Sequence, residues 1–162
     1  MLPQSTLDAA RDLLALLDAR GLTLATAESC TGGLIAAALT AIPGSSSVVA
    51  CGYVTYSNAA KAAMLGIPMG VIEGYGAVSD TVARRMAEGA LRASGVGIAV
   101  SCTGIAGPGG ATPGKPTGLV HMAAARRDGT TLAIRRVFPG DRTAVRAATV
   151  AEVLSLARSL AA

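Results

Sequence analysis

The chain has 162 residues, enough for one domain that buries a core without metal or disulfide staples, and we expect a single domain over residues 1–162. Just over half of the residues are apolar but only 2% are aromatic, so the core must consist of Ala, Val, Leu and Ile. The net charge of +4 is modest, and few aromatic side chains are available to stack on bases. No nucleic-acid partner is therefore expected.

No segment predicts a membrane span or an export signal. The longest nearly continuous apolar run covers residues 34–42, well short of the roughly 20 residues that a membrane-spanning helix needs. The first five residues contain no basic segment followed by an apolar stretch, so we expect a cytoplasmic protein. Cys30, Cys51 and Cys102 are odd in number and lack C-x-x-C spacing, so neither a disulfide framework nor a zinc site is expected.

Apolar periodicity and turn residues predict helices that alternate with strands. In the first half of the chain we expect a helix over 5–20, a strand over 22–27, a turn over 28–33 leading into a helix that ends near Ala41, a strand over 48–56, and a short helix that carries Lys61 and ends near Gly66. A loop over 66–78 and a helix after the Ser79 cap that ends near Ser94 should follow. In the remainder we expect a strand over 96–102, a long loop over 103–118, strands over 119–125 and 131–138, and a final helix capped by Asp141.

This alternation predicts an α/β fold, a three-layer α/β/α sandwich with a mixed, mostly parallel sheet. The Asp128-Gly129 turn between two apolar runs is a hairpin signal, so at least one pair of strands must be antiparallel.

Polar, glycine-rich segments follow three of the expected strands, and in such folds ligands bind beyond the carboxyl ends of the strands. Ser29 lies where the first strand turns into a helix, and Gly32 and Gly33 would leave backbone N–H groups there open to an anion or an oxyanion. Thr31, Gly32 and Gly33 are therefore expected to bind the substrate. The alternative is that Ser29 or Thr31 merely caps the helix. Cys30 is a rival nucleophile, but a cysteine flanked by apolar structure is more often part of the core.

A serine nucleophile needs a base. The only histidine, His121, lies inside an apolar strand, where a structural role is expected. Lys61 lies among alanines, and a poorly solvated lysine amine can accept the serine proton, although a surface lysine on a short helix has the same pattern. Tyr56 would donate a hydrogen bond to the substrate or orient the Lys61 amine, unless it is simply an aromatic strand end.

Two further segments are candidates for binding the substrate. Thr103 and Gly104 open a glycine-rich loop that matches neither a P-loop nor a dinucleotide fingerprint. Arg142 and Arg146 lie one turn apart at a helix start and could hold a phosphate, or could both be solvated. No cluster of His, Cys, Asp or Glu has metal-ligand spacing, so neither a metal nor a cofactor is expected.

Taken together, these segments resemble the C-terminal domain of the competence-damage-inducible protein CinA, whose stand-alone members are nicotinamide-nucleotide amidohydrolases. The resemblance covers nearly the whole chain in order. It rests on the runs Thr26–Gly33, Gly52–Asn58 with Lys61, Gly76–Ser79, Ser101–Pro108, Lys115-Pro116 with Gly118, and Gly140–Arg142.

The resemblance implies hydrolysis of the carboxamide of nicotinamide mononucleotide to nicotinic acid mononucleotide and ammonia, in NAD recycling. It also implies a metal-free pair of Ser29 and Lys61, with Tyr56 and Thr103 nearby, and a homodimer or larger assembly. The chain departs from the family pattern at Ala111, where a loop glycine is usual, and at Thr117, where a valine is usual. The alternative function is a non-catalytic nucleotide-binding or competence-related interaction module, which would not need a desolvated lysine beside a serine.

Overall fold

The computed structural model describes residues 2–162. Its elements follow in the order α1 (Gln4–Ala19), β1 (Leu24–Glu28), α2 (Leu34–Thr40), the short 3-10 turn η1 (Ser45–Ser47), β2 (Val49–Val54), α3 (Asn58–Leu65), α4 (Met69–Tyr75), α5 (Asp80–Ser94), β3 (Ile98–Gly104), β4 (Leu119–Arg126), β5 (Thr131–Val137) and α6 (Arg142–Ala161).

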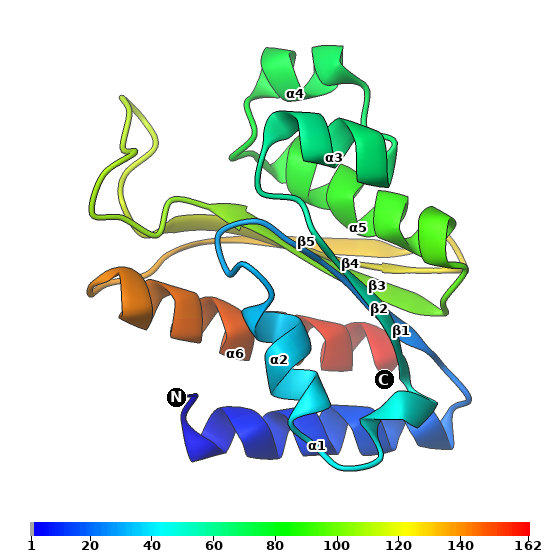
Figure 1. Cartoon of the computed structure of the whole chain (residues 1–162). Helices are drawn as coiled ribbons and strands as arrows, with labels where there is room; N and C mark the ends of the chain where they lie inside the picture. Colours follow the sequence, from blue (N-terminus) through cyan, green and yellow to red (C-terminus); the bar gives the residue numbers. More distant parts are fainter. Residues whose placement is uncertain (1) are drawn as a thin grey trace.

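The strands form one mixed sheet in the order β2-β1-β3-β4-β5. β1 pairs in parallel with β2 and β3, whereas β4 is antiparallel to both β3 and β5. β4 is therefore the one strand of this sheet that runs against the others, and the expected mostly parallel sheet with a hairpin is confirmed. Helices α1, α2 and α6 cover one face, and α3, α4 and α5 cover the other, which gives three layers (Figure 1).

Small side chains bring the layers close together, as the scarcity of aromatic residues requires. The α5 face is built largely from alanine: Ala83 and Ala87 of the helix pack on Ala123 and Ala125 of β4. On the same face Gly89 lies so close to Leu65 that an added Cβ would be 2.3 Å from the Leu65 carbonyl oxygen. This packing fixes α5 on the sheet and α3 against α5, so the position of Lys61 on α3 is set by the core.

One expected loop is in part a helix. Residues 66–78 contain α4, which begins after Pro68 and buries Ile72 in the core. The glycines Gly70 and Gly74 suggested a loop, but both face open space, so they weaken the helix without preventing it. Burial of Ile72 offsets that cost, since a buried Ile contributes about 1.5–3 kcal/mol.

Within residues 2–162, no helix combines the length and the apolar character that crossing a bilayer would require.

Candidate active site

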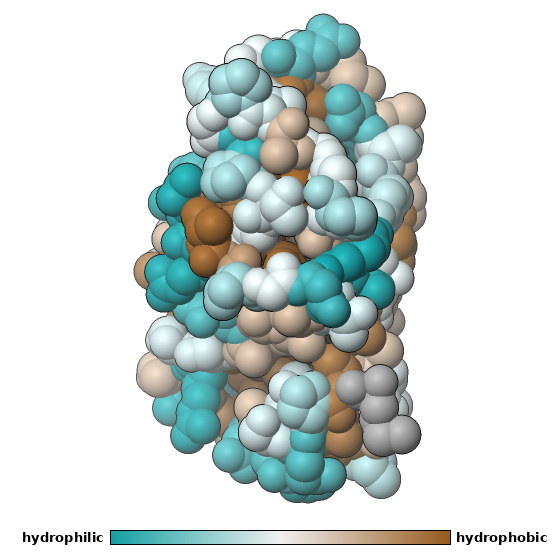
Figure 2. Space-filling model, turned by 90° about the vertical axis from the view of Figure 1, so that its left-hand side faces the viewer, coloured by the Kyte–Doolittle hydropathy of each residue, from teal (hydrophilic) through white to brown (hydrophobic). Residues whose placement is uncertain are grey.

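The turns that follow β1, β2 and β3 meet at the carboxyl edge of the sheet, on the left of Figure 1. Figure 2 faces this edge and shows hydrophilic groups on both sides of a paler centre. Beneath this surface lies a cavity of about 220 Å³. Its lining includes six of the residues expected to act on or bind the substrate: Ser29, Tyr56, Lys61, Thr103, Gly104 and Arg142.

Ser29 and Lys61 lie in direct contact at this cavity. The distance between Lys61 Nζ and Ser29 Oγ is 3.0 Å, and the same amine donates to the Thr55 carbonyl oxygen at 2.7 Å. The Thr55 N–H bonds the Glu28 carbonyl oxygen, so Ser29 and Thr55 leave neighbouring strands side by side. Ser57 caps α3 by accepting from the Ala60 N–H, and the first turn of the helix then directs Lys61 back to the strand ends.

The surroundings of the Lys61 amine favour its neutral form relative to a solvated lysine. The side chain is only 1% exposed. This burial lowers the pKa of Lys61 below its ordinary value, and the charges that Cys102 and Cys30 could carry oppose the shift without reversing it. A neutral amine at hydrogen-bond distance from a hydroxyl is a base in position to take its proton.

Cys30 also borders the cavity, but its chemistry differs from that of Ser29. The thiol is 6% exposed, and its hydrogen bond with Cys102 and its burial raise its pKa well above the ordinary value. Because the thiolate is the nucleophilic form of cysteine, this environment disfavours Cys30 as a nucleophile. No hydrogen bond joins Cys30 to Lys61 among the described residues, so the amine is directed at the serine.

The start of α2, expected to leave N–H groups for a ligand, is occupied by the chain's own Glu28. This fully buried carboxylate accepts from the Thr31 hydroxyl at 2.6 Å and from the N–H groups of Gly33, Ile35 and Ala36 at 2.9 to 3.1 Å. The Gly32 N–H donates to the Ser29 carbonyl oxygen. Thr31, Gly32 and Gly33 therefore hold the turn after Ser29, and none of them lines the cavity.

The Gly104 N–H is not used in the ladder with β4. Ile105 N–H bonds the Leu119 carbonyl oxygen, so the adjacent pair of Gly104 and Val120 is a non-hydrogen-bonded pair of the antiparallel ladder. The Gly104 N–H must then face away from β4, toward the end of β1. Thr103 is buried beside it, and its hydroxyl donates to the Ala77 carbonyl oxygen at 2.8 Å.

The two arginines at the start of α6 lie in different places. Arg142 donates to the Tyr56 hydroxyl at 3.0 Å and to the Gly107 carbonyl oxygen at 2.9 Å. It lines both the serine cavity and an adjacent hollow of about 450 Å³. Arg146 instead donates to the Thr31 carbonyl oxygen at 2.7 Å and lines neither. The sequence spacing suggested that both arginines bind one phosphate. The structure instead places Arg142 at the cavity and Arg146 at the turn that follows Ser29.

Two polar residues of the site were not identified from the sequence. Asn58, in the first turn of α3, lines the cavity, and Glu28 is its buried support. Asn58 stands three residues before Lys61, so helical periodicity places the two on one face and could have indicated it. No such spacing indicates Glu28, because its hydrogen-bond donors lie at the start of the next helix and not in its own strand.

The fold and the site define a three-layer α/β protein with a serine–lysine pair at the carboxyl edge of its sheet. The chain belongs to the CinA C-terminal domain family, whose model matches residues 7–161.

A CinA-like protein of Anaeromyxobacter sp. (strain K) is 50% identical over 146 residues, which are 90% of this chain and 36% of that protein. The chain thus spans about a third of the length of such CinA-like relatives. The nicotinamide-nucleotide amidohydrolase PncC of Enterobacter agglomerans is 52% identical over 132 residues, 82% of this chain and 80% of that protein. The competence/damage inducible protein CihA of Agrobacterium tumefaciens has a crystal structure with 46% identity and a TM-score of 0.96, covering 99% of this chain and 98% of that one.

Proposed function

We propose that the chain hydrolyses the carboxamide of nicotinamide mononucleotide to nicotinic acid mononucleotide and ammonia, in NAD recycling. The observation that carries the proposal is the 3.0 Å contact between the Ser29 hydroxyl and a buried Lys61 amine whose pKa is lowered. The name of the 52% identical PncC, a nicotinamide-nucleotide amidohydrolase, supports the choice of substrate.

In the proposed mechanism Lys61 takes the Ser29 proton as Ser29 Oγ forms a bond to the carboxamide carbon. The carbon–nitrogen bond then breaks, and the proton on Lys61 goes to the departing amine, which leaves as ammonia. Water attacks the acyl-serine with Lys61 again as base, and the proton returns to Ser29 Oγ when the acid leaves. The Gly104 N–H is the proposed oxyanion donor, since the N–H groups at the start of α2 are already used.

The direct test is ammonia release from nicotinamide mononucleotide by the purified protein in the presence of a chelator. The mechanism uses a side-chain amine as its base, so activity should persist with the chelator present. Absence of ammonia release from the mononucleotide by a folded protein would refute the proposed function.

The pH dependence of turnover should have an ascending limb set by Lys61. The neutral amine is the active form, so turnover rises as pH passes through the pKa of Lys61 and levels off above it. Because burial lowers that pKa, the limb should lie below the ordinary lysine value of about 10.4. A pH series of initial rates measures it, with circular dichroism at each pH to check folding. A limb at or above the ordinary value would contradict a desolvated base.

We expect Arg142 to contact the substrate phosphate, since its guanidinium lines both the serine cavity and the adjoining hollow. A charge-assisted contact contributes about 1.5–3 kcal/mol, so Arg142→Ala should lower kcat/KM for the mononucleotide roughly 10- to 100-fold. The phosphate-free nicotinamide riboside should be affected little. Arg11→Ala, a change to an exposed arginine of α1, is the control. Equal losses on both substrates would remove the phosphate role.

A further inference from the structure

A second group of basic side chains lies behind Thr103, on the face of the sheet that α5 covers. In the ladders of β3, β4 and β5, Thr103 stands opposite His121, and His121 stands opposite Arg135. Ala123 and Ala133, two positions further along, pack against α5. Side chains alternate between the faces of a strand, so His121 and Arg135 project on the α5 face as well, just beyond the first turn of that helix.

Lys115 reaches the same place from the long loop. Its Nζ lies 2.7 Å from the position that a Cβ would occupy at Gly76, where φ is +83°, a backbone conformation that favours glycine. Gly76 is held at the start of α5, because its carbonyl oxygen accepts from the Ser79 hydroxyl at 2.8 Å. The Thr103 hydroxyl bonds Ala77 of the same segment. The segment from Gly76 to Asp80 thus brings Lys115 and the row of Thr103, His121 and Arg135 to one place.

His121 is built into this cluster without a partner for its ring. The side chain is 9% exposed, and its Nδ1 is buried with no hydrogen bond to any described residue. A buried ring nitrogen normally finds a hydrogen-bond partner, so the unpaired Nδ1 of His121 is a free binding group at a cluster of cations.

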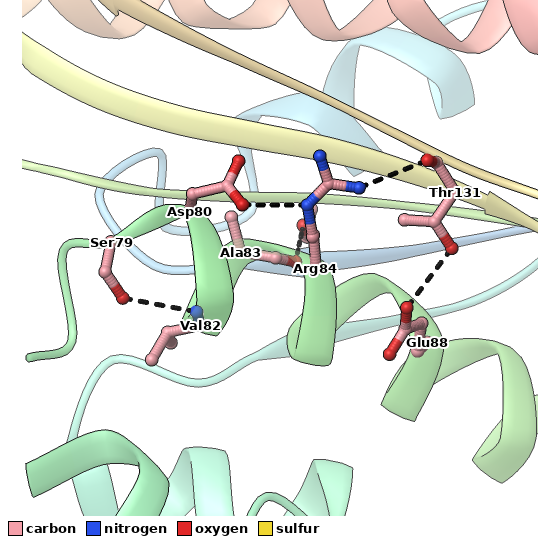
Figure 3. Close-up of polar contacts among 8 residues, drawn as sticks. Ser79, Asp80, Val82, Ala83, Arg84, Glu88 and Thr131 are labelled. Carbon is pink, nitrogen blue, oxygen red and sulfur yellow. Dashed lines mark hydrogen bonds and ion pairs between the residues drawn. The ribbon is translucent and has the colours of Figure 1, made fainter. Parts of the chain in front are cut away.

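The positive charge of the cluster is not neutralised by acidic side chains. Neither Lys115 nor Arg135 forms an ion pair within residues 2–162. Asp80 is the one carboxylate that acts on His121, and it is already bound to Arg84 at 2.8 Å (Figure 3). Burial, and then the Arg135 charge, lower the pKa of His121, with Lys115 adding to the effect and Asp80 opposing it. An anion here would supply the missing negative charge, and it would accept from the ring when Nδ1 carries a proton.

We propose that Lys115, His121 and Arg135 form a binding site for a phosphate group at the N-terminus of α5. Phosphate matches the cluster because its oxygens accept from an ammonium, a guanidinium and an imidazolium together, and because helix N-termini favour anions. The phosphate belongs either to a free ion or to a nucleotide. This site is separate from Arg142, and its existence does not depend on the proposed amidohydrolase activity.

The single histidine makes the test unambiguous, since the ring signals of His121 are the only imidazole signals in the NMR spectrum of the chain. The protein is titrated with inorganic phosphate, with nicotinic acid mononucleotide and with nicotinic acid riboside, each against sodium chloride at equal ionic strength. A pH titration of His121 is recorded with and without each compound.

We expect a saturable shift of the His121 signals with inorganic phosphate, the mononucleotide or both, and a rise of the His121 pKa, because a bound anion favours the imidazolium. A response to inorganic phosphate identifies a free-ion site, and a response to the mononucleotide alone identifies a nucleotide phosphate. Lys115→Met and Arg135→Met should each weaken the affinity about tenfold or more. Arg127→Met, at the opposite end of the sheet, should leave it unchanged.

Three results would overturn the site. They are no saturable shift with either phosphate compound, an equal shift with the phosphate-free riboside, and unchanged affinity in both Lys115→Met and Arg135→Met. Because binding is measured without turnover, a protein that binds phosphate here but releases no ammonia would refute the proposed function and leave this site standing.

Discussion

Ser29→Ala and Lys61→Ala are each expected to lower the turnover of nicotinamide mononucleotide by about 10⁴-fold or more, and the double variant should be little worse than either. In the proposed mechanism the hydroxyl and the amine, 3.0 Å apart, transfer one proton between them, so removing either partner removes the step. Ammonia release under single-turnover conditions measures the loss.

Ser46→Ala, which changes an exposed serine of η1, is the matched control and should retain full turnover. Circular dichroism and nucleotide binding establish that the inactive variants are folded. Losses that multiply in the double variant would show that the two side chains act independently, which contradicts the pair.

Glu28→Ala should lower the free energy of unfolding by roughly 3–5 kcal/mol, among the largest effects of any single change in the chain. The substitution leaves the Thr31 hydroxyl and three backbone N–H groups at the start of α2, one of them from the Gly33 cap, without their acceptor in a fully buried place. Urea unfolding monitored by circular dichroism gives the value.

The Glu28→Gln variant tests how Glu28 positions Ser29, separately from how it stabilises the fold. Glutamine keeps the shape but turns one acceptor into a donor, which must then face an N–H group of α2 or the Thr31 hydroxyl. We expect a smaller loss of stability and a fall in kcat with little change in KM, because the turn that carries Ser29 shifts while the rest of the cavity remains. Glu73→Gln on the exposed face of α4 should change stability by less than about 0.5 kcal/mol. Full stability of Glu28→Ala would refute the role of the buried carboxylate.

Much of the fold could be predicted because its local signals agree. Ser79 and Asp141 both cap the helices expected of them, and the Asp128-Gly129 turn joins β4 to β5. The exception is α4, where two glycines suggested a loop. The signal that was missing is tertiary, because burial of Ile72 against the core stabilises a helix that its own sequence does not favour.

The candidate site could be predicted only in part, because sequence spacing does not show which groups the end of a side chain contacts. Lys61 was indicated by its alanine neighbours, and the structure places its amine at Ser29. Arg142 and Arg146 share a helix face in sequence, yet one reaches Tyr56 and the other reaches Thr31. The open N–H groups expected at Gly32 and Gly33 are taken by the backbone of Ser29 and by Glu28. Such hydrogen bonds depend on distances in the folded chain, which a sequence pattern does not give.

The most direct test of the central claim compares Ser29→Ala with Cys30→Ala in one ammonia-release assay with nicotinamide mononucleotide. These neighbouring residues both border the cavity, but only Ser29 is hydrogen-bonded to Lys61, and the thiol is held protonated by Cys102 and by burial. Ser29→Ala should therefore fall to the background rate while Cys30→Ala retains most of its turnover. Near-normal release by Ser29→Ala, together with loss of release in a folded Cys30→Ala protein, would contradict the account and assign the reaction to the thiol.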